Sequence, residues 1–391
     1  MQDKLTLLMI FVLGIGGGFG LRIWASGENA RITGPNQLQV LADGSVIAAA
    51  GSHFYVHDSG GKLTRKIPAS RLKSEFYIGS FWATDADTII LRNDQLMDNT
   101  LETGLRAFAR RREPSLFESS YSGHSILQRC ELSTGICIVM GSGEGVFHTR
   151  RIFGLTADPS GQRVFVADTT SWELLELDAS ARMTRRSPLL FRFPNKLDWS
   201  EQGLWVADTN NHRLARVSTG AASFGEVLET IPVPRRPGRK KSLFDRVLTM
   251  LGLSTGPVDD FDWPIAFTRT PQGNVFVINS NTDFNATRVE MLDGGGKRIK
   301  TVMLPKSADS LDIEHDGERA LIADFKGFAI HTIGLDGKYR GTFGSEEFKR
   351  DMEELAQARL LHNILGYVGF AMMIATLFML FLAQARERRE K

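Results

Sequence analysis

A short phrase that recurs along the chain constrains the fold more than any other feature. Residues 164–170 read VFVADTT, and residues 204–210 read LWVADTN. Each copy is a run of β-branched and aromatic residues that ends in a polar turn. A second alternating segment follows each copy, WELLELD at 172–178 and HRLARVS at 212–218. Two hairpins of one design at a fixed spacing predict a repeat protein built from β-sheets.

Weaker copies of the phrase predict about six units in all. These copies end near Ala50, Arg92, Asn279 and Asp324, and most copies follow a turn such as DPSG at 158–161. Four short antiparallel strands in each unit cannot bury their own faces, but six such sheets arranged radially can. The sequence therefore predicts an all-β fold, a six-bladed β-propeller.

At these residues the chain resembles the NHL-repeat family of β-propellers. The best stretches are residues 152–178 and 195–218, and the resemblance covers roughly residues 31–344. It implies a propeller domain over residues 30–344. It implies little about activity, because propellers carry many unrelated functions.

The N-terminal segment, residues 1–25, is predicted to be a transmembrane anchor. Residues 5–21 contain no charged side chain, which is near the lower limit for a bilayer-spanning helix, and Trp24 follows as an interfacial anchor. The alternative is a signal peptide that is cleaved after Ala25. Arg22 and the bulky Trp24 just before that bond favour the uncleaved anchor.

The C-terminal segment, residues 345–391, is predicted to form a stalk helix, a second transmembrane helix and a basic cytoplasmic tail. Residues 360–385 contain no Asp, Glu, Lys or Arg, and RERREK follows at 386–391. The positive-inside rule places this tail in the cytoplasm. With two spans the N-terminus is cytoplasmic too, so we expect a bacterial inner-membrane protein with a periplasmic propeller.

Glycine residues in both predicted spans predict close packing of membrane helices. They are Gly14, Gly16, Gly18 and Gly20 in the first span, and Gly366 and Gly369 in the second. Small residues let helix backbones approach closely where the hydrophobic effect is absent. The two spans would pack together or offer a face to another membrane protein. Glycine that is merely tolerated in a span is the alternative.

The two cysteines of the chain, Cys130 and Cys137, flank the segment ELSTGI. If residues 132–135 form a hairpin turn, the cysteines lie opposite each other on neighbouring strands, close enough for a disulfide. A disulfide also fits an oxidising compartment such as the periplasm. Two buried free thiols are the alternative, and two cysteines alone do not make a metal site.

Two insertions interrupt the repeat, at about residues 94–124 and 234–258. The first contains a basic helical pattern with Arg110, Arg111 and Arg112. The second joins a basic run to an amphipathic helical pattern, and its residues are Arg235, Arg236, Arg239, Lys240, Lys241, Leu243, Phe244, Val247, Leu248 and Leu251.

Such a combination is typical of binding to an anionic membrane surface or to a protein partner. A helix packed on the flank of the propeller is the alternative interpretation. Nucleic acid is not expected as a partner, because the domain is extracytoplasmic and the formal net charge is only +2.

The sequence contains no motif that identifies a catalytic site. HExxH, GxSxG and P-loop signatures are absent. Some propellers that the chain resembles are lactonases, which hold a divalent cation in the central channel with Glu, Asn and Asp. The residues that recur here at one position of the repeat are Asp168, Asp208, Asn279 and Asp324. Recurrence favours bonding to turn backbone groups over convergent catalytic chemistry.

These observations favour a non-catalytic scaffold or recognition module in an envelope protein complex, with protein partners and no cofactor. One alternative is a metal-dependent hydrolase of the lactonase or strictosidine-synthase-like type, with a divalent cation in the propeller channel. The other is a ligand sensor, although tails of so few residues leave little room for an output domain.

Overall fold

The computed structural model describes residues 9–72, 80–94, 125–140, 152–168, 171–200, 203–234, 242–243, 261–281, 286–305 and 309–389. The chain divides into two units, which are described separately. The larger unit comprises residues 33–96 and 122–352, and the smaller comprises residues 1–32, 97–121 and 353–391.

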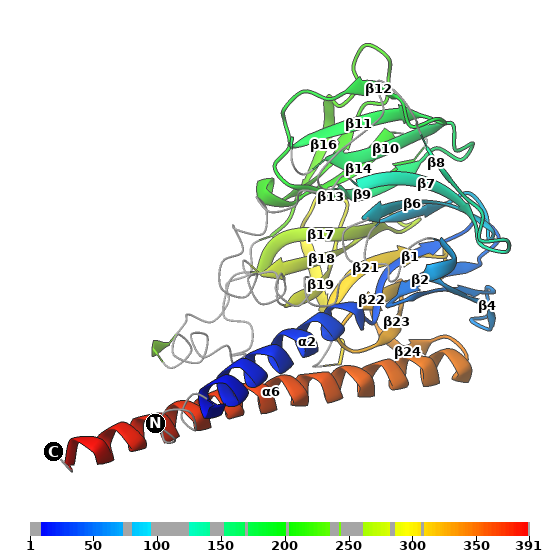
Figure 1. Ribbon diagram of the computed structural model, residues 1–391. Coiled ribbons are helices and arrows are strands. Elements are labelled where there is room, and N and C mark those ends of the chain that lie inside the picture. The colour runs from blue at the N-terminus through cyan, green and yellow to red at the C-terminus, as the bar shows by residue number, and fades with distance from the viewer. Residues whose placement is uncertain are drawn as a thin grey trace. The chain divides into compact units, whose positions relative to one another are not determined.

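In the larger unit the described strands form six antiparallel sheets, each of four consecutive strands (Figure 1). The strands of the first three sheets are β1 Pro35–Val40, β2 Val46–Ala50, β3 His53–His57, β4 Leu63–Pro68, β5 Phe81–Ala83, β6 Thr88–Asp94, β7 Ser125–Glu131, β8 Cys137–Val139, β9 Ile152–Ala157, β10 Arg163–Asp168, β11 Glu173–Asp178 and β12 Met183–Arg186. Those of the last three sheets are β13 Pro194–Ser200, β14 Gly203–Asp208, β15 Arg213–Val217, β16 Val227–Pro232, β17 Phe261–Arg269, β18 Val275–Asn281, β19 Thr287–Leu292, β20 Arg298–Val302, β21 Ser310–His315, β22 Arg319–Asp324, β23 Ala329–Gly334 and β24 Tyr339–Phe343. Short 3₁₀ turns lie at Ala69–Leu72 and Thr209–Asn211. The predicted six-bladed β-propeller is confirmed.

The first strand of each sheet lies innermost, because β1, β5, β9, β13, β17 and β21 contact one another in a closed ring. The repeated phrase of the sequence forms the second strand of each blade. In β10, Val164 and Val166 pack toward the second blade, whereas Phe165 and Ala167 pack toward the fourth. Alternate side chains of a strand point to opposite faces, so an almost wholly apolar phrase fits a sheet that is covered on both sides.

The first and last blades meet without sharing a strand. The N–H of Gly34 donates to the carbonyl oxygen of Phe325 at 3.1 Å, and a Cβ on Gly34 would lie 2.7 Å from that oxygen. Phe348 packs edge-on against Tyr55 and His57 of the first blade, with ring centroids 5.0 and 4.8 Å apart. Close backbone approach and aromatic packing therefore close the ring.

The propeller has two distinct ends, because successive strands of a blade run in opposite directions. We call the end at which the innermost strands begin the proximal end, and the other the distal end. Both insertions join strands at the proximal end, since they connect β6 to β7 and β16 to β17. The chain also enters β1 at this end, whereas Phe343 at the end of β24 lies beside His57 of the first blade, with ring centroids 5.3 Å apart.

The smaller unit contains two apolar helices. A π-helical turn at Val12–Gly16 leads into α2 (Gly17–Arg31), and α6 (Glu346–Arg389) begins in the larger unit and continues through the smaller one. The segments Met9–Arg31 and Glu346–Arg386 are long and apolar enough to cross a membrane. Figure 1 shows α2 running alongside α6.

Candidate functional site

A cluster of charged side chains lies among the innermost strands. The ammonium group of Lys196, on β13 of the fourth blade, reaches β21 of the sixth. Its Nζ lies 2.7 Å from Oδ1 of Asp312, 2.5 Å from Oε1 of Glu314 and 2.5 Å from the carbonyl oxygen of Ile313. An ammonium group has three donors, and three acceptors surround this one. The Lys196 side chain therefore has no free hydrogen-bonding capacity for a ligand.

Strand periodicity places these side chains together. Lys196 and Asp198 are two residues apart on β13, and Asp312 and Glu314 are two apart on β21, so each pair lies on one face of its strand. The apolar residue between them packs the other way: Leu197 lies in the core shared with the third blade. None of these four residues was predicted from the sequence as part of a site. A charge at alternate positions of an innermost strand is the signal that could have found them.

Neutral amides join the innermost strands on the other side of the ring. The Gln37 side chain on β1 donates to the carbonyl of Phe81 and accepts from its N–H, both at 2.9 Å. Gln39 makes the same pair of bonds to Ala83. These two side chains connect β1 to β5 as a further strand would, so the inner polar groups link neighbouring blades.

Burial sets the protonation behaviour of the charged cluster. The exposed fraction is 13% for the Lys196 side chain, 8% for Asp312 and 24% for Glu314. Burial raises the pKa of Glu314 to about 8, although the charge of Lys196 opposes this. Burial also raises the pKa of Asp198. For Lys196, burial lowers the pKa, but the charges of Asp312 and Glu314 outweigh it and raise the pKa.

A divalent cation at this position would compete with the ammonium group for the same oxygens. The backbone N–H of Leu38 already donates to Oδ2 of Asp312 at 2.9 Å. Among the residues that the structure describes, no group of three or more His, Cys, Asp or Glu side chains is arranged to hold a metal ion. The geometry is that of an ion-paired link between blades.

The recurring acids of the repeat bind turn backbone groups. Asp208 is fully buried, and its carboxylate accepts from the N–H of Arg192 and the guanidinium of Arg213, both at 2.8 Å. Asp324 accepts from the N–H groups of Asp309 and Gly327, both at 2.8 Å. Asp168 accepts from the N–H of Ser171 at 3.3 Å, so the three aspartates have the structural role that the repetition favoured. The amide of Asn279 instead donates to the Glu290 side chain at 3.1 Å.

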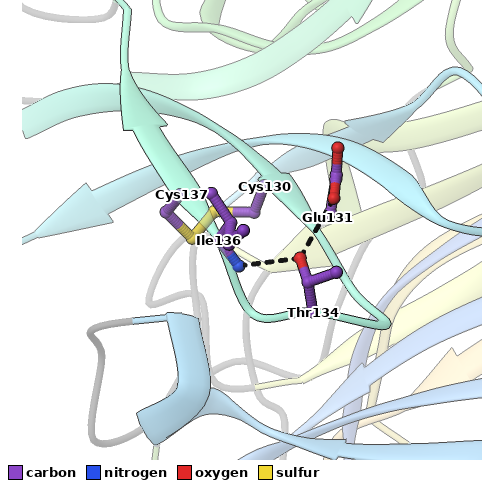
Figure 2. Close-up of a disulfide and its surroundings, with 5 residues drawn as sticks. All are labelled: Cys130, Glu131, Thr134, Ile136 and Cys137. Atoms are coloured by element: carbon purple, nitrogen blue, oxygen red, sulfur yellow. Dashed lines mark hydrogen bonds between the residues drawn. A yellow bond between two sulfur atoms is a disulfide. The ribbon is translucent and has the colours of Figure 1, made fainter.

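Cys130 and Cys137 form a disulfide, as the hairpin pattern predicted (Figure 2). They are directly paired across β7 and β8, with Cα atoms 4.1 Å apart. The hydroxyl of Thr134 donates to Glu131 at 3.0 Å and accepts from the N–H of Ile136 at 3.1 Å. The disulfide and these bonds fix the end of one hairpin.

The predicted packing glycines divide into two groups. A Cβ on Gly14 would overlap Oγ1 of Thr376, and a Cβ on Gly18 would lie 2.5 Å from the carbonyl oxygen of Gly369. No atom of the described residues lies within 4 Å of a Cβ added to Gly16 or Gly20. A Cβ on Gly366 would lie 3.8 Å from the methyl group of Ala25, which is an ordinary contact distance.

The paired helices are antiparallel, since contacts move down α6 as they move up α2. Toward the end of α2, Trp24 lies 5.2 Å from the ring of His362, and the Asn29 side chain donates to that of Asn363 at 2.8 Å. An antiparallel pair is the arrangement that a protein with both termini on one side of a membrane requires.

Most of the predicted membrane or partner surface lies outside the described residues. This holds for Arg110, Arg111, Arg112, Arg235, Arg236, Arg239, Lys240, Lys241, Phe244, Val247, Leu248 and Leu251. Leu243 is described, and its side chain is 78% exposed. The prediction for this surface therefore stays a prediction.

Comparison with known proteins adds no family. No protein-family model and no curated protein sequence matches the chain. Similar solved structures include a protein of unknown function from Bacteroides caccae (10% identity, TM-score 0.41, covering 69% of this chain and 81% of that one). Hydrazine synthase from Kuenenia stuttgartiensis is similar at 11% identity and a TM-score of 0.38, covering 65% of each chain. Selenomethionine-substituted virginiamycin B lyase from Staphylococcus aureus is similar at 14% identity and a TM-score of 0.43, covering 75% of this chain and 92% of that one. Similarities at this level carry no functional argument, and the assignment of the fold rests on the six sheets.

Proposed function

We propose that the chain is a membrane-anchored, NHL-like propeller that acts as a non-catalytic scaffold or recognition module for proteins of the bacterial envelope. The observation that carries the proposal is the position of Lys196, whose three donors are used by Asp312, Ile313 and Glu314. Since these inner polar groups satisfy one another, recognition falls to the outer surfaces and the insertions. The proposal needs no cofactor.

Anchoring in the inner membrane is the second part of the proposal. The apolar segments at both ends of the chain and the close approach of Gly18 to Gly369 support it. Both termini would be cytoplasmic and the propeller periplasmic. A reporter fused after Lys391 tests this orientation: green fluorescent protein should fluoresce there, and alkaline phosphatase, which needs oxidised cysteines, should be inactive. An active phosphatase fusion at that position would contradict the orientation.

The helix pair offers a test with a matched control. Gly18→Leu places a side chain against the backbone of Gly369, whereas Gly20→Leu adds the same side chain where no atom of the described residues lies within 4 Å. We expect Gly18→Leu to weaken the packing of α2 on α6 and Gly20→Leu to leave it intact. Disulfide crosslinking between cysteines introduced at Ala25 and Gly366 measures the pairing in membranes. Equal crosslinking in the two variants would show that the glycine contact does not matter.

The role of the second insertion is tested by deleting residues 235–253. The deletion should leave the propeller folded but abolish recovery of partner proteins from solubilised membranes. A control replaces the five basic residues of this run by serine and keeps the apolar positions. Loss of partners in both variants would assign recognition to the basic run, and loss in the deletion alone would assign it to the apolar face. Unchanged recovery in both would remove the insertion from the proposal.

A further inference from the structure

The two ends of the propeller differ in what their loops expose. Large apolar side chains project from three loops of the proximal end: Trp172 is 49% exposed, Leu189 73%, Leu190 45% and Met303 77%. These residues lie between β10 and β11, between β12 and β13, and between β20 and β21. In the described loops of the distal end, Ile136 is the only large apolar residue that is exposed.

Trp172 occupies a turn position where a bulky residue is unfavourable. Its φ is +61°, in the left-handed region that glycine adopts most easily. His212 and Phe328 follow the recurring Asp at the same spacing and also have positive φ, of 51° and 52°. The ring of His212 packs on Trp263 with centroids 5.1 Å apart, and Phe328 is buried. Trp172 differs from both, because half of its surface faces solvent.

The loop that carries Leu189 and Leu190 is fixed in place. The carbonyl oxygen of Leu190 accepts from Nδ2 of Asn211 at 3.3 Å and from the guanidinium of Arg213 at 3.2 Å. Arg213 is itself paired with the buried carboxylate of Asp208 at 2.8 Å. The two leucines are therefore presented by an anchored loop.

The two ends also differ in charge: the distal end is the more acidic, and the end with the exposed apolar residues carries the basic insertions. Acidic residues outnumber basic ones in the described turns of the distal end: six of these turns carry Asp43, Asp58, Asp158, Asp293, Asp316 and Asp336, whereas the basic residues are Lys62, Arg182, Lys297 and Lys338. Both basic insertions join strands at the proximal end, and so does the segment that leads from the apolar helix α2 into β1. An anionic bilayer would repel the distal end and attract the proximal one.

We propose that the proximal end contacts the bilayer, with Trp172, Leu189, Leu190 and Met303 inserted into the headgroup region of an anionic membrane. This inference rests on the proposed membrane anchoring. A bilayer is favoured over a protein because α2 ends at Arg31 and β1 begins at Pro35 at this same end, so a membrane that holds α2 would be adjacent to these loops. A planar lipid surface can contact the tips of several such loops at once. Tryptophan is also enriched at membrane–water interfaces.

The test uses the full-length protein in vesicles of phosphatidylethanolamine and phosphatidylglycerol. The two native cysteines form a disulfide, so single introduced cysteines can carry an environment-sensitive fluorophore. Labels at Leu189→Cys and Met303→Cys report on the proximal end, with Gln272→Cys and Glu318→Cys as controls in distal turns. Phe378→Cys, on an exposed position of α6, reports whether the helix is in the bilayer. Lipids with nitroxide quenchers at two depths then place each label.

We expect shallow quenching at 189 and 303 to be several-fold greater than at 272 and 318, with deep quenching at 378. If the label at position 378 is quenched but the labels at 189 and 303 are quenched no more than the distal labels, the inference is wrong while the membrane anchoring stands. If 378 is not quenched, the anchoring fails and the inference with it. If the labels at positions 189 and 303 are shielded from water in native membranes but not in lipid vesicles, a protein covers this surface. That result would overturn the bilayer contact.

Trp172→Gly separates folding from membrane contact. Glycine suits the positive φ, so this variant should fold at least as stably as the unmodified protein. We expect it to reduce quenching of the Leu189→Cys label in a double variant. Unchanged quenching would remove Trp172 from the proposed surface.

Discussion

Contacts made by the innermost strands of the propeller join residues far apart in the sequence, whereas the outermost strands also make contacts between residues that are close in the sequence. On the inside, Lys196 pairs with Asp312 at a sequence separation of 116. On the outside, Cys130 and Cys137 are 7 positions apart, and Arg340 pairs with Asp336 only four positions away. The inner contact connects two blades, whereas each outer contact stabilises one hairpin. The inner ion pair therefore links two blades that are far apart in the sequence, in addition to the apolar cores that neighbouring blades share.

Burial differs between the two regions as well. The side chains of Arg340 and Asp336 are 57% and 42% exposed, against 13% and 8% for Lys196 and Asp312. An exposed pair is screened by water and contributes little, whereas removing one partner of a buried pair leaves a desolvated charge. Similar ion pairs should thus have very different effects when they are broken.

The largest effect is expected for Lys196→Met. The variant leaves Asp312 and Glu314 without their cation, and it should lower the free energy of unfolding by about 3–5 kcal/mol. Arg340→Met, which breaks the exposed pair, is the matched control and should leave the free energy of unfolding nearly unchanged. Denaturant unfolding of both variants measures the difference. Equal and small losses would show that the inner pair does not link the blades.

A smaller loss is expected when the disulfide of the outer hairpin is removed. The double variant Cys130→Ala/Cys137→Ala should lose about 2.5 kcal/mol on the chain-entropy estimate for so short a loop. Because the disulfide lies within one blade, contacts between blades should stay intact apart from those of Cys130, which packs in the core shared by the first and second blades. Hydrogen exchange should show increased opening of β7 and β8 alone. Increased exchange throughout the propeller would contradict the local role of the disulfide.

The third effect concerns pH and the inner cluster, and it is the smallest of the three for a change of one pH unit. Burial raises the pKa of Glu314 from 4.5 to about 8. A carboxyl group with a raised folded-state pKa stabilises the fold fully below the unfolded-state pKa, and this contribution is lost as pH rises through the folded-state pKa. Stability should therefore fall by roughly 1 kcal/mol per pH unit between about pH 5 and 8.

Glu314→Gln should remove this slope, because glutamine cannot titrate. Glu318→Gln, in an exposed distal turn, is the control and should keep it. Urea unfolding across this pH range measures both variants. A slope that survives Glu314→Gln would assign the pH dependence to other groups.

The difference in sequence separation between these contacts also explains which features could be predicted from the sequence. The repeated phrase and the cysteine hairpin are local patterns, and both predictions are confirmed. The cluster of Lys196, Asp312 and Glu314 forms only when the fourth and sixth blades close into a ring. No spacing along the chain indicates that closure, although the alternation of charges on β13 and β21 was visible. The glycine pattern predicted close packing without identifying which residues take part, since Gly14 and Gly18 face α6 and Gly16 and Gly20 do not.

The central claim is that the propeller recruits proteins and does not perform metal-dependent chemistry. Purification from native membranes in mild detergent tests it, with mass spectrometry of the recovered proteins and metal analysis of the same sample. We predict stoichiometric membrane or envelope proteins and no divalent metal. A chain recovered alone with about one divalent ion, and with lactone hydrolysis in the same fraction, would contradict the account.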